Sequence, residues 1–97
     1  MFFLDQENPK VLLAPMAGVG DVAFRRICLE HGADLTYTEM VSAKGLSYSS
    51  EKTRDLITIA PGENSAAVQI FGHEPKVMAE QARWIEDSLG DSLAYID

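Results

Sequence analysis

Short apolar runs alternate with helical patterns along most of this chain, and that alternation limits the folds open to it. Residues 11–14 (Val-Leu-Leu-Ala) form a continuous apolar run that ends at Pro15, which is typical of a buried parallel strand. Residues 35–39, 66–71 and 93–97 predict three further strands. Residues 56–59 (Leu-Ile-Thr-Ile) suggest a strand or hairpin piece that ends at Pro61 and Gly62. Strand–helix alternation of this kind builds parallel, right-handed units.

The first predicted helix covers residues 22–31. Asp21 can cap its first turn by accepting a hydrogen bond from a free backbone amide. The side chains of residues 23, 24, 27 and 28 (Ala, Phe, Ile and Cys) share one apolar face, where we expect Cys28 to pack in the core as a small hydrophobic residue. Gly32 supplies the left-handed residue that often ends a helix.

Two later segments also have helical character. Residues 42–50 are compatible with a short helix. Pro75 suits the first position of a longer helix, because a backbone N–H at that position would have no hydrogen-bond partner within the helix. Residues 78, 82, 85 and 89 are apolar at spacings of four, three and four, and Gly90 follows as the stop.

The length of the chain limits how much of an α/β fold it can hold. With 97 residues it forms one domain at most. Parallel strands that are buried on both faces need neighbours on both edges, and a complete eight-fold barrel takes about 250 residues. We therefore expect residues 1–97 to be part of a larger sheet, and a chain of this length would make up well under half of such a barrel.

Composition argues against several classes of function. Eight basic and fifteen acidic residues give a net charge of −7, which argues against nucleic-acid binding by this piece alone. The apolar runs are too short to span a membrane, and residues 1–4 lack the basic start of a signal peptide, so we expect a cytoplasmic protein. Cys28 is the one cysteine, and neither His31 nor His73 has a partner at metal-ligand spacing, so no disulfide and no metal are expected.

The loop after the first strand, residues 15–21, lies where parallel α/β folds bind ligands. Its small residues allow a flat or phosphorylated ligand to approach the backbone, although a plain strand-to-helix turn would also use glycine. A second interpretation is a dinucleotide-binding turn: Gly18, Gly20 and Ala23 match G-x-G-x-x-A, and Glu39 follows at the distance of a ribose-binding acid. Against that interpretation, residues 15–17 separate the strand from the first glycine.

Five segments in this order resemble the opening of a tRNA-dihydrouridine synthase. They are residues 13–19 (Leu-Ala-Pro-Met-Ala-Gly-Val) with Asp21, Phe24 and Arg25; residues 32–35; residues 38–46; residues 68–72 (Val-Gln-Ile-Phe-Gly); and residues 94–97. Together they cover nearly the whole chain after residue 10.

The resemblance implies that residues 1–97 are the N-terminal part, about four β/α units, of an FMN-binding TIM (β/α)8 barrel, with the rest of the barrel and a smaller C-terminal helical domain absent. In that family NADPH reduces FMN, the flavin passes a hydride to C6 of a uracil in tRNA, and a cysteine protonates C5. Pro15, Met16 and Ala17 would correspond to the stretch whose backbone lies against the flavin ring. Gln69 would correspond to the glutamine at the polar edge of the ring, and an amide offers the donor and acceptor that such an edge requires.

The chain departs from the family pattern in two places. Gly20 stands where the family usually has Thr, which should change the flavin contact little because Asp21 remains. The family's Gly-Cys-Pro loop, its flavin-phosphate residues and its tRNA-binding helical domain would follow Asp97, so no catalytic residue is expected here. We expect the 97-residue piece alone to be inactive and to form a homo-oligomer through exposed strand edges. Glu39 is expected to order a loop, and Lys44 to be solvated rather than bound to tRNA.

Overall fold

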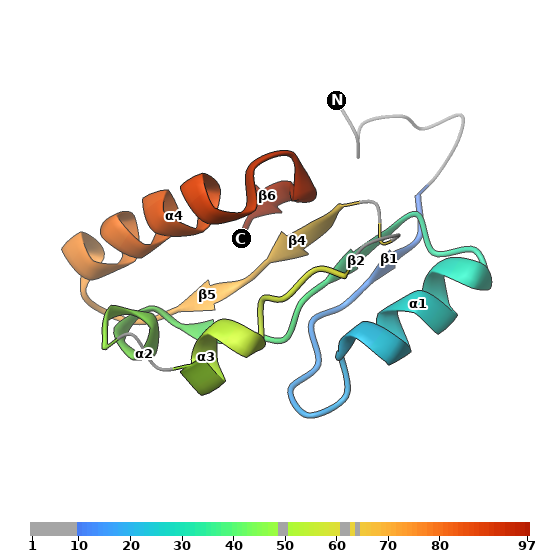
Figure 1. Ribbon diagram of the computed structural model, residues 1–97, viewed down its shortest axis with the longest axis horizontal. Helices are drawn as coiled ribbons and strands as arrows, with labels where there is room; N and C mark the ends of the chain where they lie inside the picture. Colours follow the sequence, from blue (N-terminus) through green and yellow to red (C-terminus); the bar gives the residue numbers. More distant parts are fainter. Residues whose placement is uncertain (1–9, 49–50, 61–62, 64) are drawn as a thin grey trace.

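A computed structural model of the chain describes residues 10–48, 51–60, 63 and 65–97 (Figure 1). The main strands and helices that the sequence predicts are present, except the strand over residues 56–59, and two short elements over residues 41–42 and 51–55 are additional. The elements in order are β1 (Leu12–Leu13), α1 (Val22–Glu30), β2 (Leu35–Tyr37), β3 (Val41–Ser42), α2 (Ala43–Ser47), α3 (Glu51–Asp55), β4 (Ala66–Val68), β5 (Ile70–Phe71), α4 (Pro75–Leu89), the 3-10 turn η2 (Gly90–Ser92) and β6 (Leu93–Ile96).

The main sheet has four parallel strands in the order β1-β2-β4-β6. A smaller parallel pair, β3 and β5, continues beyond it. In Figure 1 the strands run between α4, in orange, and α1, in cyan. Within the described part of the chain, β1 and β6 each pair on one side only. This is a mixed α/β fold with a parallel sheet, as the dihydrouridine synthase resemblance leads one to expect.

The predicted segment 66–71 is interrupted at Gln69. β4 pairs with β2 and β6, whereas β5 pairs with β3, so Gln69 lies where the chain changes partners. The β4–β6 register also shifts between Ala66 and Val68. One continuous strand would have kept the same two neighbours along its whole length.

The predicted strand over residues 56–59 is wrong. The backbone N–H groups of Leu56, Ile57 and Thr58 each donate to the carbonyl three residues earlier, at the end of α3. These bonds are those of a tight helical turn, and they use the N–H groups that a strand ladder would need. Ile57 is nevertheless buried, because it packs into the core from this turn. Pro61 and Gly62, which we expected to end the segment, lie outside the described residues.

Helix α1 begins and ends as predicted, but its predicted apolar face is only partly right. Asp21 Oδ1 accepts from the Phe24 N–H at 2.9 Å, and Gly32 follows the helix with φ of +106°. Ile27 and Ala23 are exposed, Ile27 by 54%, and Cys28 is half-buried rather than a full core residue. Arg25 takes the buried position. The apolar pattern of α1 predicted that its apolar side chains face the core. The buried position is instead held by the Arg25 guanidinium, which has buried hydrogen-bond partners.

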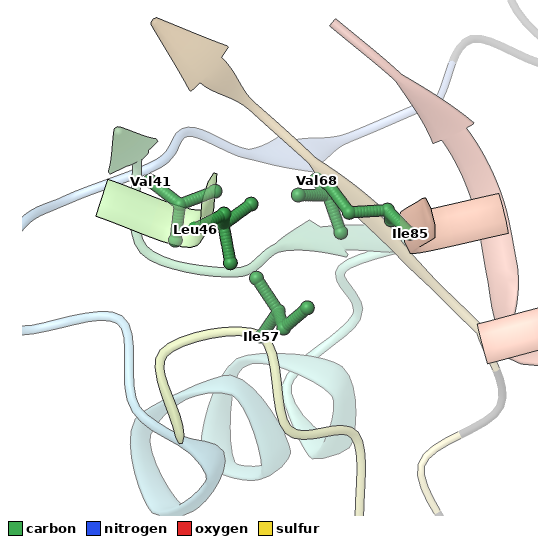
Figure 2. Close-up of a cluster of buried hydrophobic side chains, with 5 residues drawn as sticks. All are labelled: Val41, Leu46, Ile57, Val68 and Ile85. Atoms are coloured by element: carbon green, nitrogen blue, oxygen red, sulfur yellow. The ribbon is translucent and has the colours of Figure 1, made fainter. Parts of the chain in front are cut away.

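The core lies between α4, the β3-β5 pair and the α2–α3 segment. Figure 2 shows five buried side chains that point toward one another: Val41, Leu46, Ile57, Val68 and Ile85. They come from β3, α2, the turn after α3, β4 and α4. Each such side chain contributes about 1.5–3 kcal/mol when fully buried. The cluster therefore fixes the α2–α3 segment and α4 against the same side of β4.

Helix α4 has the predicted boundaries. Pro75 occupies its first turn and Gly90, with φ of +52°, follows its last residue. Trp84 packs at the margin of the core, with the Arg54 guanidinium 5.0 Å from its ring centroid. None of the helices in the described part of the chain has both the length and the apolar character that a membrane span needs.

Candidate functional site

The carboxyl ends of the four parallel strands meet at one edge of the sheet, because parallel strands all run the same way. Ligands of open α/β sheets and of barrels bind at this edge. The loop after β1 carries Pro15, Met16 and Ala17, the loop after β2 carries Glu39, Gln69 follows β4, and Asp97 follows β6. The predicted site residues are therefore at the same edge, with β2 between the loop of residues 15–17 and Gln69.

The loop after β1 closes into a tight turn on the carbonyl of Met16. The backbone N–H groups of Val19 and Gly20 donate to this oxygen at 3.2 and 2.8 Å. Gly18 has φ of +75°, a conformation that costs other residues free energy. Gly20 is buried, and a Cβ at that position would come within 3.2 Å of the Met16 carbonyl oxygen. Gly20 therefore permits a tight turn that a side chain would crowd.

Glu39 orders this loop, as we expected. Its Oε1 accepts a hydrogen bond from the Gly18 backbone N–H, so the loop after β2 is joined to the loop after β1. The dinucleotide interpretation needs the glycine turn to present free amides to a pyrophosphate and the acid to bind a ribose. Here the Gly18 amide and the Glu39 carboxylate bind each other, and α1 begins only at Val22. This geometry argues against the dinucleotide interpretation.

Gln69 is held on both sides of its backbone. Its carbonyl accepts from the Val41 N–H at 2.9 Å. Asp97 brackets it from β6: the Asp97 N–H donates to the Val68 carbonyl and the Ile70 N–H donates to the Asp97 carbonyl, both at 2.9 Å. The Gln69 side chain is half-buried, and its Nε2 donates to Asp97 Oδ2 at 2.8 Å. The amide therefore has a defined position at the edge of the sheet.

Tyr37 of β2 and Tyr95 of β6 form a pair on the face of the sheet that carries Gln69 and Asp97. The pair lies further from the carboxyl ends of the strands than those two residues do. The Tyr37 and Tyr95 hydroxyls are 2.8 Å apart and the rings meet edge to face, with centroids 5.8 Å apart. Because β4 separates their strands, the rings reach across β4, where Ala67 is small enough to lie beneath them. Burial, followed by the hydrogen bond to Tyr37, raises the pKa of Tyr95 well above that of a free tyrosine. The pair forms an uncharged floor below Gln69 and Asp97.

Arg25 supports the loop from behind, and the sequence analysis did not identify this role. Its Nε and Nη2 donate to the two carboxylate oxygens of Glu63 at 2.7 and 3.1 Å. Its other contacts are the carbonyls of Gly20 and Thr58, each at 2.7 Å. The sequence offered one signal for Arg25, which is its place directly after Phe24 in the family motif. No neighbouring residue in the sequence marks Glu63 as its partner.

Other polar residues that we considered lie elsewhere. Lys44 is exposed, as expected, and pairs with Glu74 at 3.6 Å beside a cavity of about 210 Å³ at the end of β5. His31 bonds the Ile27 carbonyl through its ring Nδ1. Across the residues that the structure describes, no three His, Cys, Asp or Glu side chains are grouped as a metal site would require.

Comparison with known proteins identifies the family. The family model described as dihydrouridine synthase (Dus) matches residues 12–93. A probable tRNA-dihydrouridine synthase of Treponema pallidum is 50% identical over 87 residues, which is 90% of this chain and 26% of that protein. The tRNA-dihydrouridine synthase B of Shewanella oneidensis is 40% identical over 79 residues, 81% of this chain and 24% of that protein. The Escherichia coli K12 protein of the same name is 40% identical over 78 residues.

The chain spans about a quarter of the length of these relatives. The family match includes the loop after β1, β2 and its loop, Gln69 and all of α4. On the extent of this match, the chain belongs to the dihydrouridine synthase family.

Proposed function

We propose that this chain is part of a tRNA-dihydrouridine synthase, a cytoplasmic oxidoreductase that uses FMN and NADPH to reduce the C5–C6 bond of a uridine in tRNA. The support comes from the names of the relatives and from the arrangement of residues at the carboxyl edge of the sheet. The proposal concerns the protein in its complete form, because the relatives are about four times longer than this chain.

The residues present fit the ring of a flavin. Gln69 has one amide hydrogen committed to Asp97, which leaves its carbonyl oxygen and its second hydrogen for the polar edge of the ring. Pro15, Met16 and Ala17 form a loop with small side chains nearby, so a flat ring can approach the backbone. Glu39 and Arg25 hold that loop in place.

When bound, FMN would supply the hydride chemistry, and the residues of this chain would bind and orient it. The loop of residues 15–17 and the Gln69 amide lie on either side of β2, so a ring that contacts both extends across that strand. Cys28 is not assigned as the proton donor, because it is half-buried in α1 rather than at the edge where the strands end. The uncharged Tyr37–Tyr95 pair would separate the site from the deeper interior.

The single observation that carries the proposal is the half-buried Gln69 amide at the carboxyl edge of the sheet. The test is to purify the complete protein, add FMN, and follow the visible flavin absorbance and the quenching of flavin fluorescence. Gln69→Ala should weaken binding by about tenfold, the usual size of a lost ligand hydrogen bond. Gln81→Ala, on α4, removes the same side chain away from the edge and should leave binding unchanged. Failure of the wild-type protein to bind FMN would refute the flavin assignment.

The tRNA substrate is tested separately. The FMN-loaded complete protein should convert uridine to dihydrouridine in unmodified tRNA when NADPH is supplied, and not when NADPH is omitted. A flavin-loaded protein that oxidises NADPH but leaves every uridine of the tRNA intact would show that the substrate is something else.

We also propose that the 97-residue piece, taken alone, self-associates and lacks activity. The supporting observation is that β1 and β6 each pair on one side only within the described residues. Unpaired strand edges recruit other strands. Sedimentation of the isolated chain should give a dimer or a larger species, and a monomer that unfolds in one sharp transition would contradict this.

A further inference from the structure

We propose that Asp97 is a positioning residue: its carboxylate sets which way round the Gln69 amide is held, and so decides which hydrogen-bonding groups meet the ligand. The inference rests on the proposed function for the identity of that ligand, a flavin, but the orientation itself can be tested without any ligand. Nothing in the family match assigns a role to Asp97.

The backbone places Asp97 beside Gln69. Asp97 donates its N–H to the Val68 carbonyl and accepts at its own carbonyl from the Ile70 N–H, both at 2.9 Å. These two bonds lie on either side of Gln69, so Asp97 is its direct neighbour across the sheet, on the same face. The Val41 N–H holds the Gln69 carbonyl from the other side. The two side chains are therefore placed next to each other before either of them makes a contact.

The chemistry of the two side chains decides which end of the Gln69 amide binds Asp97. A carboxylate only accepts hydrogen bonds, whereas an amide has a donor end and an acceptor end. The Asp97 carboxylate can therefore bind only the nitrogen of Gln69, and the 2.8 Å bond from Nε2 to Oδ2 is that arrangement. The opposite orientation would set the Gln69 oxygen against a negative oxygen. As a result, Gln69 offers Oε1 as an acceptor together with one N–H donor, in one fixed orientation.

The residues near Asp97 also bear on the charge of its carboxylate. Tyr95 lies two residues before Asp97 on the same face of β6, and its hydroxyl is occupied with Tyr37. The floor below Asp97 therefore supplies no cation that would neutralise the carboxylate. A charged acceptor makes stronger hydrogen bonds than a neutral one, so the carboxylate favours the orientation in which Gln69 donates to it.

Asp97→Asn tests the inference with almost no change in shape. An asparagine can accept from or donate to Gln69, so the amide becomes free to take both orientations. In the flavin-free complete protein, the side-chain amide signals of Gln69 in ¹⁵N–¹H NMR spectra should shift or split in Asp97→Asn. Asp91→Asn is the matched control, because it removes the same charge from an exposed position in η2 and should leave these signals unchanged.

Flavin affinity gives the second measurement. Asp97→Asn should weaken FMN binding by about three- to tenfold, the range expected for one misdirected hydrogen bond. In a Gln69→Ala background the same substitution should have no further effect, because Asp97 acts only through Gln69. A Gln69→Glu variant should bind FMN poorly, since two carboxylates then face each other, and adding Asp97→Asn should restore part of the affinity.

The outcomes separate the two proposals. A wild-type protein that binds no FMN refutes the proposed function, and the NMR comparison still tests the orientation of Gln69. Identical Gln69 signals in wild type and Asp97→Asn overturn the positioning role, as does an equal loss of affinity from Asp97→Asn with and without Gln69. If Asp97→Asn does not fold, the single variant Gln69→Glu carries the test, and FMN binding as tight as in the wild type would overturn the positioning role.

Discussion

Arg25 and Glu63 form an ion pair that is hidden from solvent on both sides, with Arg25 Nε 2.7 Å from Glu63 Oε1 and side-chain exposures of 1% and 0%. Arg25 also binds the carbonyls of Gly20 and Thr58, and Glu63 accepts from the Ala60 N–H at 2.9 Å. One guanidinium thus connects α1, the loop after β1 and the segment after α3. The loop proposed to face the flavin is thus held by an ion pair that is buried away from solvent.

Removing one partner of this pair should be costly. Arg25→Met leaves the Glu63 carboxylate buried without its cation, and we expect the free energy of unfolding to fall by about 3–5 kcal/mol. Urea denaturation measures this. Arg26→Met, at the exposed neighbouring position, should change stability by about 0.5 kcal/mol or less. The double variant Arg25→Met/Glu63→Met should recover part of the loss, and a double variant less stable than Arg25→Met alone would contradict the buried-charge argument.

The core cluster predicts a contrast between two isoleucines. Ile85 is fully buried on α4, and Ile85→Ala should lower the free energy of unfolding by about 2–5 kcal/mol. Ile27, on α1, is 54% exposed, so Ile27→Ala should change stability by about 0.5 kcal/mol or less. Thermal and urea unfolding of both variants would measure the difference. Equal losses would mean that α1 buries the face that its sequence pattern suggested.

Glu39 should control the mobility of the loop after β1. Glu39→Ala removes the acceptor of the Gly18 N–H, and we expect hydrogen exchange at that amide to speed up by about tenfold or more, since hydrogen bonds to charged groups contribute about 1.5–3 kcal/mol. Glu80→Ala, on the exposed side of α4, is the control. Binding of NADH by the flavin-free protein, abolished by Glu39→Ala, would instead revive the dinucleotide interpretation.

Tyr95 predicts a loss of stability at high pH. Its pKa in the folded protein is raised, mainly by burial, while in the unfolded chain it ionises near pH 10, about the value of a free tyrosine. Above about pH 10 the unfolded state loses this proton and the folded state keeps it, so the free energy of unfolding falls as pH rises. The stability difference between wild type and Tyr95→Phe should therefore shrink above that pH in urea titrations.

The control for this experiment is Tyr48→Phe, which removes a hydroxyl from a side chain that is 73% exposed. A decline of equal steepness in wild type and Tyr95→Phe would show that other groups cause the alkaline loss. The Tyr37→Phe variant should reduce the effect, because the Tyr37 hydroxyl is the second cause of the raised pKa of Tyr95.

Much of the architecture could be predicted because it depends on near neighbours in the chain. The Asp21 cap is bonded to a residue three positions away, and Pro75 and Gly90 set the limits of α4 through their own backbone preferences. The family motifs also located Gln69 and the loop of residues 15–17 at the edge where the strands end.

Residues 56–59 show where such reasoning fails. Their apolar, β-branched composition is equally compatible with a strand and with a buried turn, and the choice depends on what α3 and the core offer. Arg25 shows the same limit on α1: a charged side chain is expected at the surface until a partner 38 residues away is found beside it.

The sequence by itself determined the main strands, the caps of α1 and α4 and the position of the loop after β1, since each follows from residues within a few positions of one another. Only the tertiary structure decided which side chains meet: Glu63 with Arg25, Glu39 with the Gly18 amide, and Asp97 with Gln69. The physical reason is that these hydrogen bonds join residues 21 to 38 positions apart, and parallel pairing of the strands brings them within reach.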